Sequence, residues 1–178
     1  QLGAATVYVS LLERRGRAQD SIECLALDAT QIRNLVLSIL LLQGRYPAVS
    51  LECLNLKYFT ERLRGFPVDA DGLDRTLRVT SQGELFLTAY LDDEPFHLGC
   101  YDAGALAELW HSEKVRAAFQ RADQRPFTVE KCRTCFAWPW CRGGSAAFAW
   151  TANGTFDGVD GFCEAKRDLV RELTGVMT

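Results

Sequence analysis

The sequence predicts an α/β fold in its first part and a smaller α+β region after it. Three observations carry this prediction: a strand–helix–strand pattern in the first sixty residues, a hairpin pattern over residues 76–90, and four cysteines gathered in the last third. Strands separated by a helix are typical of a parallel sheet with helices on its face, whereas strands joined by a tight turn pair antiparallel. We therefore expect two domains, residues 1–72 and residues 73–178.

The first sixty residues contain the elements of a βαβ unit. Ala5–Leu11 alternates weakly and is rich in Val and Tyr, which favours a strand. A helix is expected from a cap at Asp28 or Thr30 to about Gln43, with the following glycine ending it, because apolar residues recur there at three- and four-residue spacings. Ala48–Cys53 alternates apolar and polar side chains, as a half-buried strand does.

The second part of the chain has a different pattern. Two β-rich runs, residues 76–80 and 84–90, are joined by a short segment with a glycine, which predicts a β-hairpin. Residues 102–122 show helical spacing that is broken once, near its middle. Residues 125–162 are aromatic and read as loop-rich, and Cys163 opens a final amphipathic helix. These elements predict a small α+β domain.

Composition excludes several classes of function. Twenty Lys and Arg residues against twenty-three Asp and Glu give a net charge of -3, which leaves no excess positive field for nucleic acid or an anionic membrane. The longest apolar run, Leu35–Leu42, is far shorter than the roughly 20 residues that cross a bilayer. No secretory signal is apparent, so we expect a cytoplasmic protein. The first residue is Gln1 rather than Met, which favours a processed chain or a piece of a longer one.

Four of the seven cysteines form a pattern typical of metal ligands. Cys132 and Cys135 are separated by two residues, Cys141 follows after five more, and Cys163 opens the last helix. Four clustered thiols without a secretion signal indicate ligands rather than disulfides. Four thiolates suit either an all-cysteine zinc site or a [4Fe-4S] cluster, and the spacing by itself separates the two poorly.

The residues around these cysteines bear on the kind of site. Gly143 and Gly144 permit a close approach of the backbone, so that N–H groups can donate to sulfur. Several aromatic residues either shield a cluster from water or belong to the ordinary core. These aromatic residues are Phe136, Trp138, Trp140, Phe148 and Trp150.

The remaining cysteines and the two histidines have simpler interpretations. Cys24 and Cys53 lie in apolar contexts and are expected in the core, because free cysteines are among the most buried residues. Cys100 is expected in a local turn. His97 and His111 have no Ser, Asp or Cys partner at a recognisable spacing, so we expect surface or capping roles rather than a catalytic triad.

Several segments together resemble the radical SAM enzymes that carry a C-terminal SPASM domain, a family that includes peptide maturases and anaerobic sulfatase maturases. Residues 77–87 are similar to the hairpin that opens this domain, and Phe96–Gly99 followed by Leu106–Trp110 resembles its turn and helix. The run from Cys132 to Gly144 is similar to its cysteine signature. The resemblance covers about residues 77–173. It implies that the first domain is the end of a radical SAM partial (β/α) barrel and the second a SPASM-like iron–sulfur domain.

The departures from the family pattern are as informative as the match. A full SPASM domain has seven cysteines for two auxiliary [4Fe-4S] clusters. Here residues 67–73 contain no cysteine, and Thr88 and Ser145 stand at two other ligand places of the first cluster. The four clustered cysteines match the ligands of the second. The resemblance therefore implies a reduced SPASM domain with one auxiliary [4Fe-4S] cluster, with zinc as the alternative.

The CxxxCxxC motif that binds the catalytic cluster and S-adenosylmethionine in this family does not occur in the sequence. The chain alone is therefore not expected to be catalytic, and S-adenosylmethionine would belong to a parent or partner chain that carries the motif. The leading hypothesis is the auxiliary-cluster portion of an enzyme that modifies a ribosomally made peptide or a protein, completed by an N-terminal barrel half or by a partner chain. The alternatives are a noncatalytic SPASM-like subunit that binds a peptide or docks onto a partner, and a structural four-cysteine zinc protein.

Overall fold

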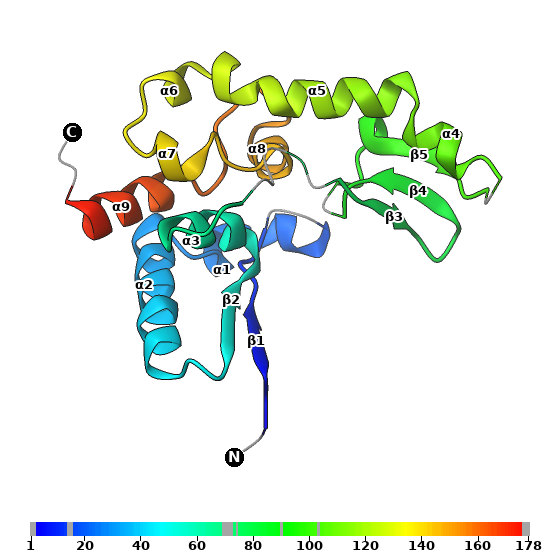
Figure 1. Cartoon of the computed structure of the whole chain (residues 1–178). Coiled ribbons are helices and arrows are strands. Elements are labelled where there is room, and N and C mark those ends of the chain that lie inside the picture. The colour runs from blue at the N-terminus through cyan, green and yellow to red at the C-terminus, as the bar shows by residue number, and fades with distance from the viewer. Residues whose placement is uncertain are drawn as a thin grey trace. The chain divides into compact units, whose positions relative to one another are not determined.

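The computed structural model describes most of the chain and divides it into two compact units (Figure 1). The described residues are 3–13, 16–68, 73, 75–89, 91–102 and 104–175. Unit 1 comprises Gln1–Val68, Phe136–Cys141 and Phe162–Thr178, and unit 2 comprises Asp69–Cys135 and Arg142–Gly161. Each unit therefore combines segments that are distant in sequence. The functional division into residues 1–72 and 73–178 remains a prediction.

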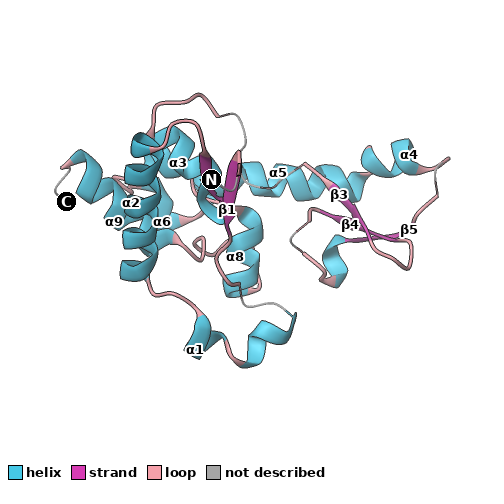
Figure 2. Cartoon of the chain, turned by 90° about the horizontal axis from the view of Figure 1, so that it is seen from below, coloured by secondary structure: helices cyan, strands magenta, loops and turns pink. Residues whose placement is uncertain are grey.

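Unit 1 contains the predicted βαβ arrangement. Strand β1 (Thr6–Val9) pairs in parallel with β2 (Ser50–Cys53), with Thr6 opposite Ser50 and Val9 opposite Cys53. Helix α2 (Ala29–Arg45) connects them and packs against β2 (Figures 1 and 2). The parallel pairing follows from the length of the connection, because a tight turn cannot join parallel strands. The predicted strand–helix–strand pattern is confirmed.

Helix α2 begins at the predicted residue and ends later than expected. Asp28 accepts a hydrogen bond from the Gln31 backbone N–H at 2.8 Å, and the Gln31 side chain accepts one from the Asp28 N–H at 2.9 Å. This reciprocal capping box satisfies two backbone donors of the first turn. The expected stop at Gly44 was wrong, because the helix continues to Arg45 and the Tyr46 N–H still bonds to an α-helical carbonyl. A glycine within the last turn weakens a helix without ending it.

A buried side chain ties together the carboxyl ends of the two parallel strands. Asn55 lies in the 3-10 turn Leu54–Leu56 that follows β2, and its Oδ1 accepts the backbone N–H of Leu11 at 2.7 Å. The Asn55 Nδ2 donates to Glu13 Oε1 at 2.6 Å. The segment after β1 is therefore held by the segment after β2, beyond the last pair of the ladder.

The other elements of unit 1 are mostly helical. They are η1 (Gly16–Asp20), α1 (Ile22–Leu25), α3 (Lys57–Leu63), α7 (Trp138–Cys141) and α9 (Cys163–Thr174). Helix α9 packs against α2, and α7 packs against α3. The final helix from Cys163 is confirmed. Buried apolar residues of unit 1 include Ile32, Val36, Ile39, Leu56, Phe59, Ala165, Leu169 and Val170.

Unit 2 contains a three-stranded antiparallel sheet in the order β3-β4-β5. Its strands are β3 (Leu77–Val79), β4 (Glu84–Leu87) and β5 (His97–Cys100). Gly83 has a φ of 79° in the turn before β4, a conformation that glycine adopts without strain. The predicted hairpin is confirmed, although its expected last residue, Tyr90, lies outside the described residues. Strand β5 was not predicted, because it is short and follows an irregular segment.

Helices cover much of the rest of unit 2. They are η3 (Glu94–Phe96), α4 (Leu106–Trp110), α5 (Glu113–Thr128), α6 (Glu130–Arg133) and α8 (Ala146–Asn153). The predicted break after α4 is present, and Ser112 caps α5 by accepting the Val115 N–H. The expectation of loops over residues 125–162 was wrong. The helices there are too short for a periodic pattern, or apolar on all sides as in α8, so their sequence carries little helical signal.

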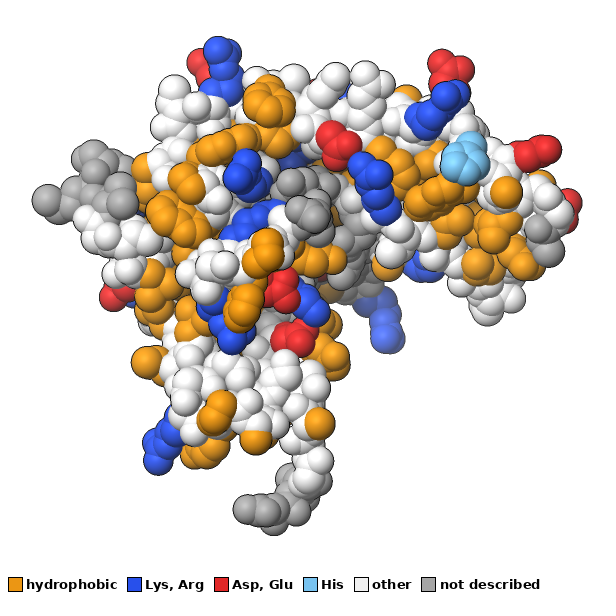
Figure 3. Space-filling model, viewed as in Figure 1, with side chains coloured by type: hydrophobic (Ala, Val, Ile, Leu, Met, Phe, Trp, Pro, Cys, Tyr) orange, Lys and Arg blue, Asp and Glu red, His pale blue; other side chains and the backbone are white. Residues whose placement is uncertain are grey.

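The core of unit 2 joins the sheet to its helices. Its buried members are Leu73, Leu87, Leu91, Phe96, Val115, Ala122, Ala146, Ala147 and Phe156. Figure 3 shows acidic and basic side chains interspersed on the visible faces of both units, in keeping with the small net charge. Among the described residues, no helix is both long enough and apolar enough to span a membrane.

The exposed edge of strand β1 leads us to expect self-association of the isolated chain. Val7 is 41% exposed and Tyr8 60% exposed, and within the described part of the chain β1 pairs only with β2. An exposed strand edge with apolar side chains is a template for pairing with another chain. We expect Tyr8→Lys to lower the apparent mass at high concentration in size-exclusion chromatography with light scattering.

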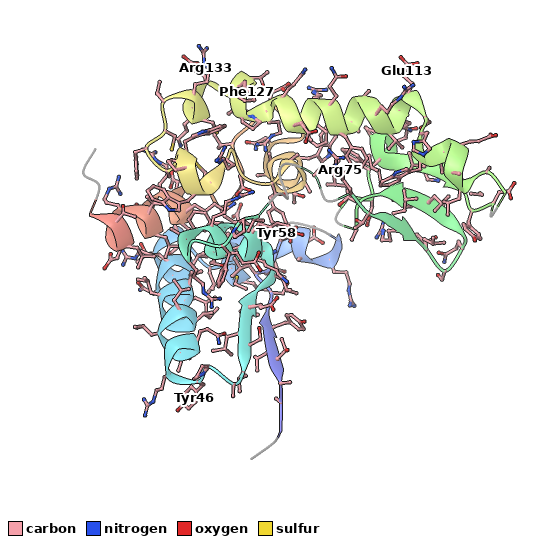
Figure 4. All side chains as sticks on the ribbon, in the orientation of Figure 1. Tyr46, Tyr58, Arg75, Glu113, Phe127 and Arg133 are labelled. Carbon is pink, nitrogen blue, oxygen red and sulfur yellow. The ribbon has the colours of Figure 1, made fainter. Side chains whose placement is uncertain are left out.

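Tyr46→Lys is the matched control, since this tyrosine is 50% exposed at the end of α2 and lies outside the strand (Figure 4). A wild-type chain that stays monomeric at high concentration would contradict the expectation. So would an equal effect of both substitutions.

Candidate metal centre

Cys132 and Cys135 lie in one turn of unit 2. Cys132 is buried within α6, Cys135 is half-buried just after it, and the Cys135 N–H donates to the Cys132 carbonyl at 3.2 Å. The turn begins at Val129, whose carbonyl accepts the Cys132 N–H at 2.9 Å. The two thiols are therefore carried by a short segment with a defined backbone, as a two-residue spacer between ligands requires.

Cys141 and Cys163 belong to unit 1. Cys141 is the last residue of α7, where its N–H donates to the Ala137 carbonyl at 2.8 Å, and it is half-buried. Cys163 is the first residue of the twelve-residue helix α9 and is also half-buried. The first turn of a helix has unpaired N–H groups and a positive dipole end, which favour negative charge on a nearby sulfur.

The four predicted ligands thus occur as one pair in each unit. Among the residues that the structure describes, no three His, Cys, Asp or Glu side chains gather in an arrangement that could hold a metal ion. The donor chemistry nevertheless fits the group that the sequence implies, because all four are thiols shielded at least in part from water. The four-cysteine ligand set remains a prediction.

The other cysteines occupy different environments. Cys53 is 2% exposed at the end of β2, as expected for a core residue, and its burial raises the pKa of its thiol. The expected burial of Cys24 was wrong: it is exposed, because the one-turn helix α1 buries Ile22 instead. Cys100 is exposed at the end of β5.

The two histidines lie at the surface of unit 2. His111 is exposed and follows the last residue of α4, which agrees with the capping role expected from the sequence. His97 is half-buried on β5, with its ring 5.0 Å from that of Phe86 and its Nε2 3.8 Å from Glu84 Oε1. Both contacts are across neighbouring strands of the sheet.

The loop after Cys141 has an unusual backbone. Arg142, Gly143 and Gly144 follow one another with φ values of 52°, 81° and 70°. Gly144 is closely approached by the Asp160 side chain and not, as expected, by a sulfur: the three atoms nearest to a Cβ built on Gly144 all belong to Asp160, and the Asp160 Cβ would lie 2.6 Å away. The Asp160 carboxylate is 3% exposed and accepts the Ser145 N–H at 2.7 Å. No sequence pattern marks this carboxylate, because the burial of an aspartate depends on contacts with distant residues.

Arg125 is a second buried charged residue that no sequence pattern singles out. It lies near the end of α5, is 1% exposed, and its guanidinium donates to four backbone carbonyls of unit 2. These acceptors are Phe156, Gly143 at 3.2 Å, Gly144 at 3.3 Å and Gly158 at 2.8 Å. Arginine is normally a surface residue, so nothing in the sequence marked this one.

The aromatic residues near the cysteines serve the packing of the units. Trp150 packs on the core of unit 2 with its ring 4.9 Å from that of Phe96 in an edge-on arrangement, and Phe148 is buried. In unit 1, the guanidinium groups of Arg167 and Arg171 both lie 5.3 Å from the centre of the Phe136 ring. Core packing therefore explains Phe148 and Trp150, and cation–π contacts cover Phe136.

Ser145 and Thr88 stand where the resemblance expects two further cysteine ligands, and both have other roles in the fold. Ser145 caps α8 by accepting the Phe148 N–H at 3.4 Å. Thr88 is fully buried with a φ of 71°, and its N–H donates to the Thr76 carbonyl at 2.8 Å beside the β3–β4 ladder. Neither side chain can take the place of a thiolate ligand.

The fold of this chain is similar to part of a solved enzyme structure. No protein-family model matches the sequence, and no curated protein shows a significant match. Among solved structures, the chain is similar to anSMEcpe, an anaerobic sulfatase-maturating radical SAM enzyme with a SPASM domain. Its structure with bound AdoMet matches with a TM-score of 0.60 and 17% identity over 93% of this chain and 44% of that one. The structure with bound AdoMet and a peptide gives 0.59 and 16% over 85% and 44%.

This likeness is one of fold. The chain has a mixed α/β structure that matches part of a radical SAM/SPASM protein, and it spans less than half of the length of these neighbours. The predicted relationship is supported to that extent.

The contact between Gly144 and Asp160 predicts a specific cost of substitution. Gly144→Ala introduces both a left-handed alanine and a clash with the Asp160 side chain. We expect it to lower the free energy of unfolding by about 1–2 kcal/mol for the backbone and by about 1–3 kcal/mol more for overpacking. Urea denaturation of both proteins measures the difference.

Gly83→Ala is the matched control for this measurement. Gly83 has a similar φ of 79° in the same unit, and a Cβ there would meet no atom within 4 Å. It should therefore show the backbone cost alone. Equal losses for the two substitutions would mean that Asp160 does not constrain the loop.

Proposed function

We propose that this chain is the auxiliary iron–sulfur portion of a radical SAM enzyme that modifies a ribosomally made peptide or a protein. The observation that carries the proposal is the likeness of fold over 93% of the chain to part of a sulfatase-maturating radical SAM enzyme. That neighbour has been solved with AdoMet and with a peptide. The cysteine signature in the sequence supports the same family independently of the fold.

Cys132, Cys135, Cys141 and Cys163 would hold one [4Fe-4S] cluster. Four thiolates complete the coordination of a cubane, so no iron is left open to bind substrate. When bound, the cluster supplies a one-electron redox centre. The protein's part is to keep the thiols shielded, since solvent exposure is one of the factors that set the potential of such a centre.

The catalytic motif would come from elsewhere. The sequence has no CxxxCxxC, so binding of S-adenosylmethionine and the start of radical chemistry belong to a barrel half preceding this part or to a partner chain. The peptide or protein substrate would bind to that complete enzyme. In this scheme the chain contributes electron transfer or substrate positioning.

Metal analysis after anaerobic purification tests the proposal. We expect about four irons and four sulfides per chain, with a broad visible absorbance, as a cubane gives. Cys141→Ala should lose most of the iron, because it removes one of four ligands. Cys100→Ala removes an exposed cysteine outside the signature and should keep the wild-type iron content.

One zinc per chain and no iron would overturn the iron–sulfur assignment and favour a structural four-cysteine site, which is colourless. Equal metal contents in the two cysteine variants would overturn the ligand set.

A further inference from the structure

We infer that Arg125 is a positioning residue for the proposed cluster site, because its side chain fixes the chain segments that border two of its four predicted ligands. This inference rests on the proposed function. It concerns a residue that lies outside the cysteine signature and that no sequence pattern singles out.

The guanidinium of Arg125 is buried and hydrogen-bonded to acceptors of the backbone. Arg125 is 1% exposed, and removing such a group from water is costly unless its donors are paired. Its Nε donates to the Phe156 carbonyl, Nη1 to Gly143 and Gly144, and Nη2 to Gly158. All four acceptors are backbone atoms, so the side chain holds the path of the chain itself.

The four acceptor carbonyls lie in two segments of the chain, each next to a predicted ligand. Gly143 and Gly144 directly follow Arg142, the residue after Cys141. Phe156 and Gly158 belong to the segment that leads through Asp160 to Cys163. One planar side chain therefore fixes both the segment that leaves one predicted ligand and the segment that approaches another.

The turn that carries Cys132 and Cys135 follows directly on the helix of Arg125. The backbone carbonyl of Arg125 accepts the Val129 N–H at 2.9 Å, and the Val129 carbonyl accepts the Cys132 N–H at 2.9 Å. The start of α6 is thus hydrogen-bonded to the end of α5 at the same residue. The side chain of Arg125 thus connects the segments that border Cys141 and Cys163, and it projects from the end of the helix that leads into the CxxC turn.

The contacts of Arg125 require an arginine side chain. A guanidinium presents five N–H donors in a planar fork, whereas a lysine ammonium is a compact point charge on a flexible chain. Lysine keeps the charge of Arg125 but cannot reach acceptors on two separate segments with fixed directions. Asp160 holds the same loop from another side through the Ser145 N–H, so the loop is constrained at two points.

The test compares Arg125→Lys with Arg121→Lys in anaerobically loaded protein. Arg121 lies one turn earlier on α5 and pairs with Asp157 at 2.6 Å, with both side chains more than half exposed. We expect Arg125→Lys to speed iron release to a chelator by about tenfold or more, as loss of an outer-sphere constraint typically does. The EPR signal of the reduced cluster should also change. Arg121→Lys should leave both readouts at the wild-type level.

Circular dichroism of the iron-free proteins shows whether each variant folds. Arg125→Gln, which leaves no buried charge unpaired, replaces Arg125→Lys if the latter does not fold, and the same criteria apply. A folded variant with wild-type release rate and EPR signal overturns the inference while leaving the proposed function intact. A wild-type chain that binds no iron overturns the proposed function, and this inference with it.

Discussion

A charged guanidinium sealed from water is the constraint on which the second unit depends. With Arg125 1% exposed, the chain must present carbonyls in the plane of its side chain. Two of these carbonyls belong to Gly143 and Gly144, whose backbone lies in the left-handed region, where glycine costs little. The close fit of Asp160 against Gly144 then leaves no room for a Cβ. The buried guanidinium and the two glycines thus act together in this loop: the glycines permit its backbone, and Arg125 and Asp160 hold it.

The first unit depends on a different kind of constraint. Parallel sheets are normally covered on both faces, because the helices of their crossovers lie there. Here β1 pairs only with β2 among the described residues and leaves Tyr8 60% exposed. The ends of the strands are nevertheless well defined, since Asn55 pairs with the backbone of Leu11 and with Glu13. The first unit therefore combines an exposed strand edge with strand ends that are held by side-chain hydrogen bonds.

Elements with strong local signals were predictable from the sequence, and those held by distant contacts were not. The capped helix α2, the β3–β4 hairpin and the helix from Cys163 each follow from caps, turn residues or periodicity. The short helices α6 and α7 and the strand β5 lack such patterns, because a single turn or four residues cannot display a period. The same limit applies to the candidate site. Cysteine spacing marks possible ligands, whereas the burial of Arg125 and Asp160 depends on residues many positions away.

The geometry at Thr88 bears on why the proposed site is a reduced one. A β-branched residue with a φ of 71° is strained by about 1–3 kcal/mol, and the buried Thr88 hydroxyl has no hydrogen-bond partner among the described residues. The side chain therefore gains no hydrogen bond that would offset the strain. The Thr88 N–H, by contrast, donates to the Thr76 carbonyl beside the β3–β4 ladder. In the proposed scheme, Thr88 would put a nonligating side chain at a ligand place of the first cluster, and the four signature cysteines would supply the donors for one cluster.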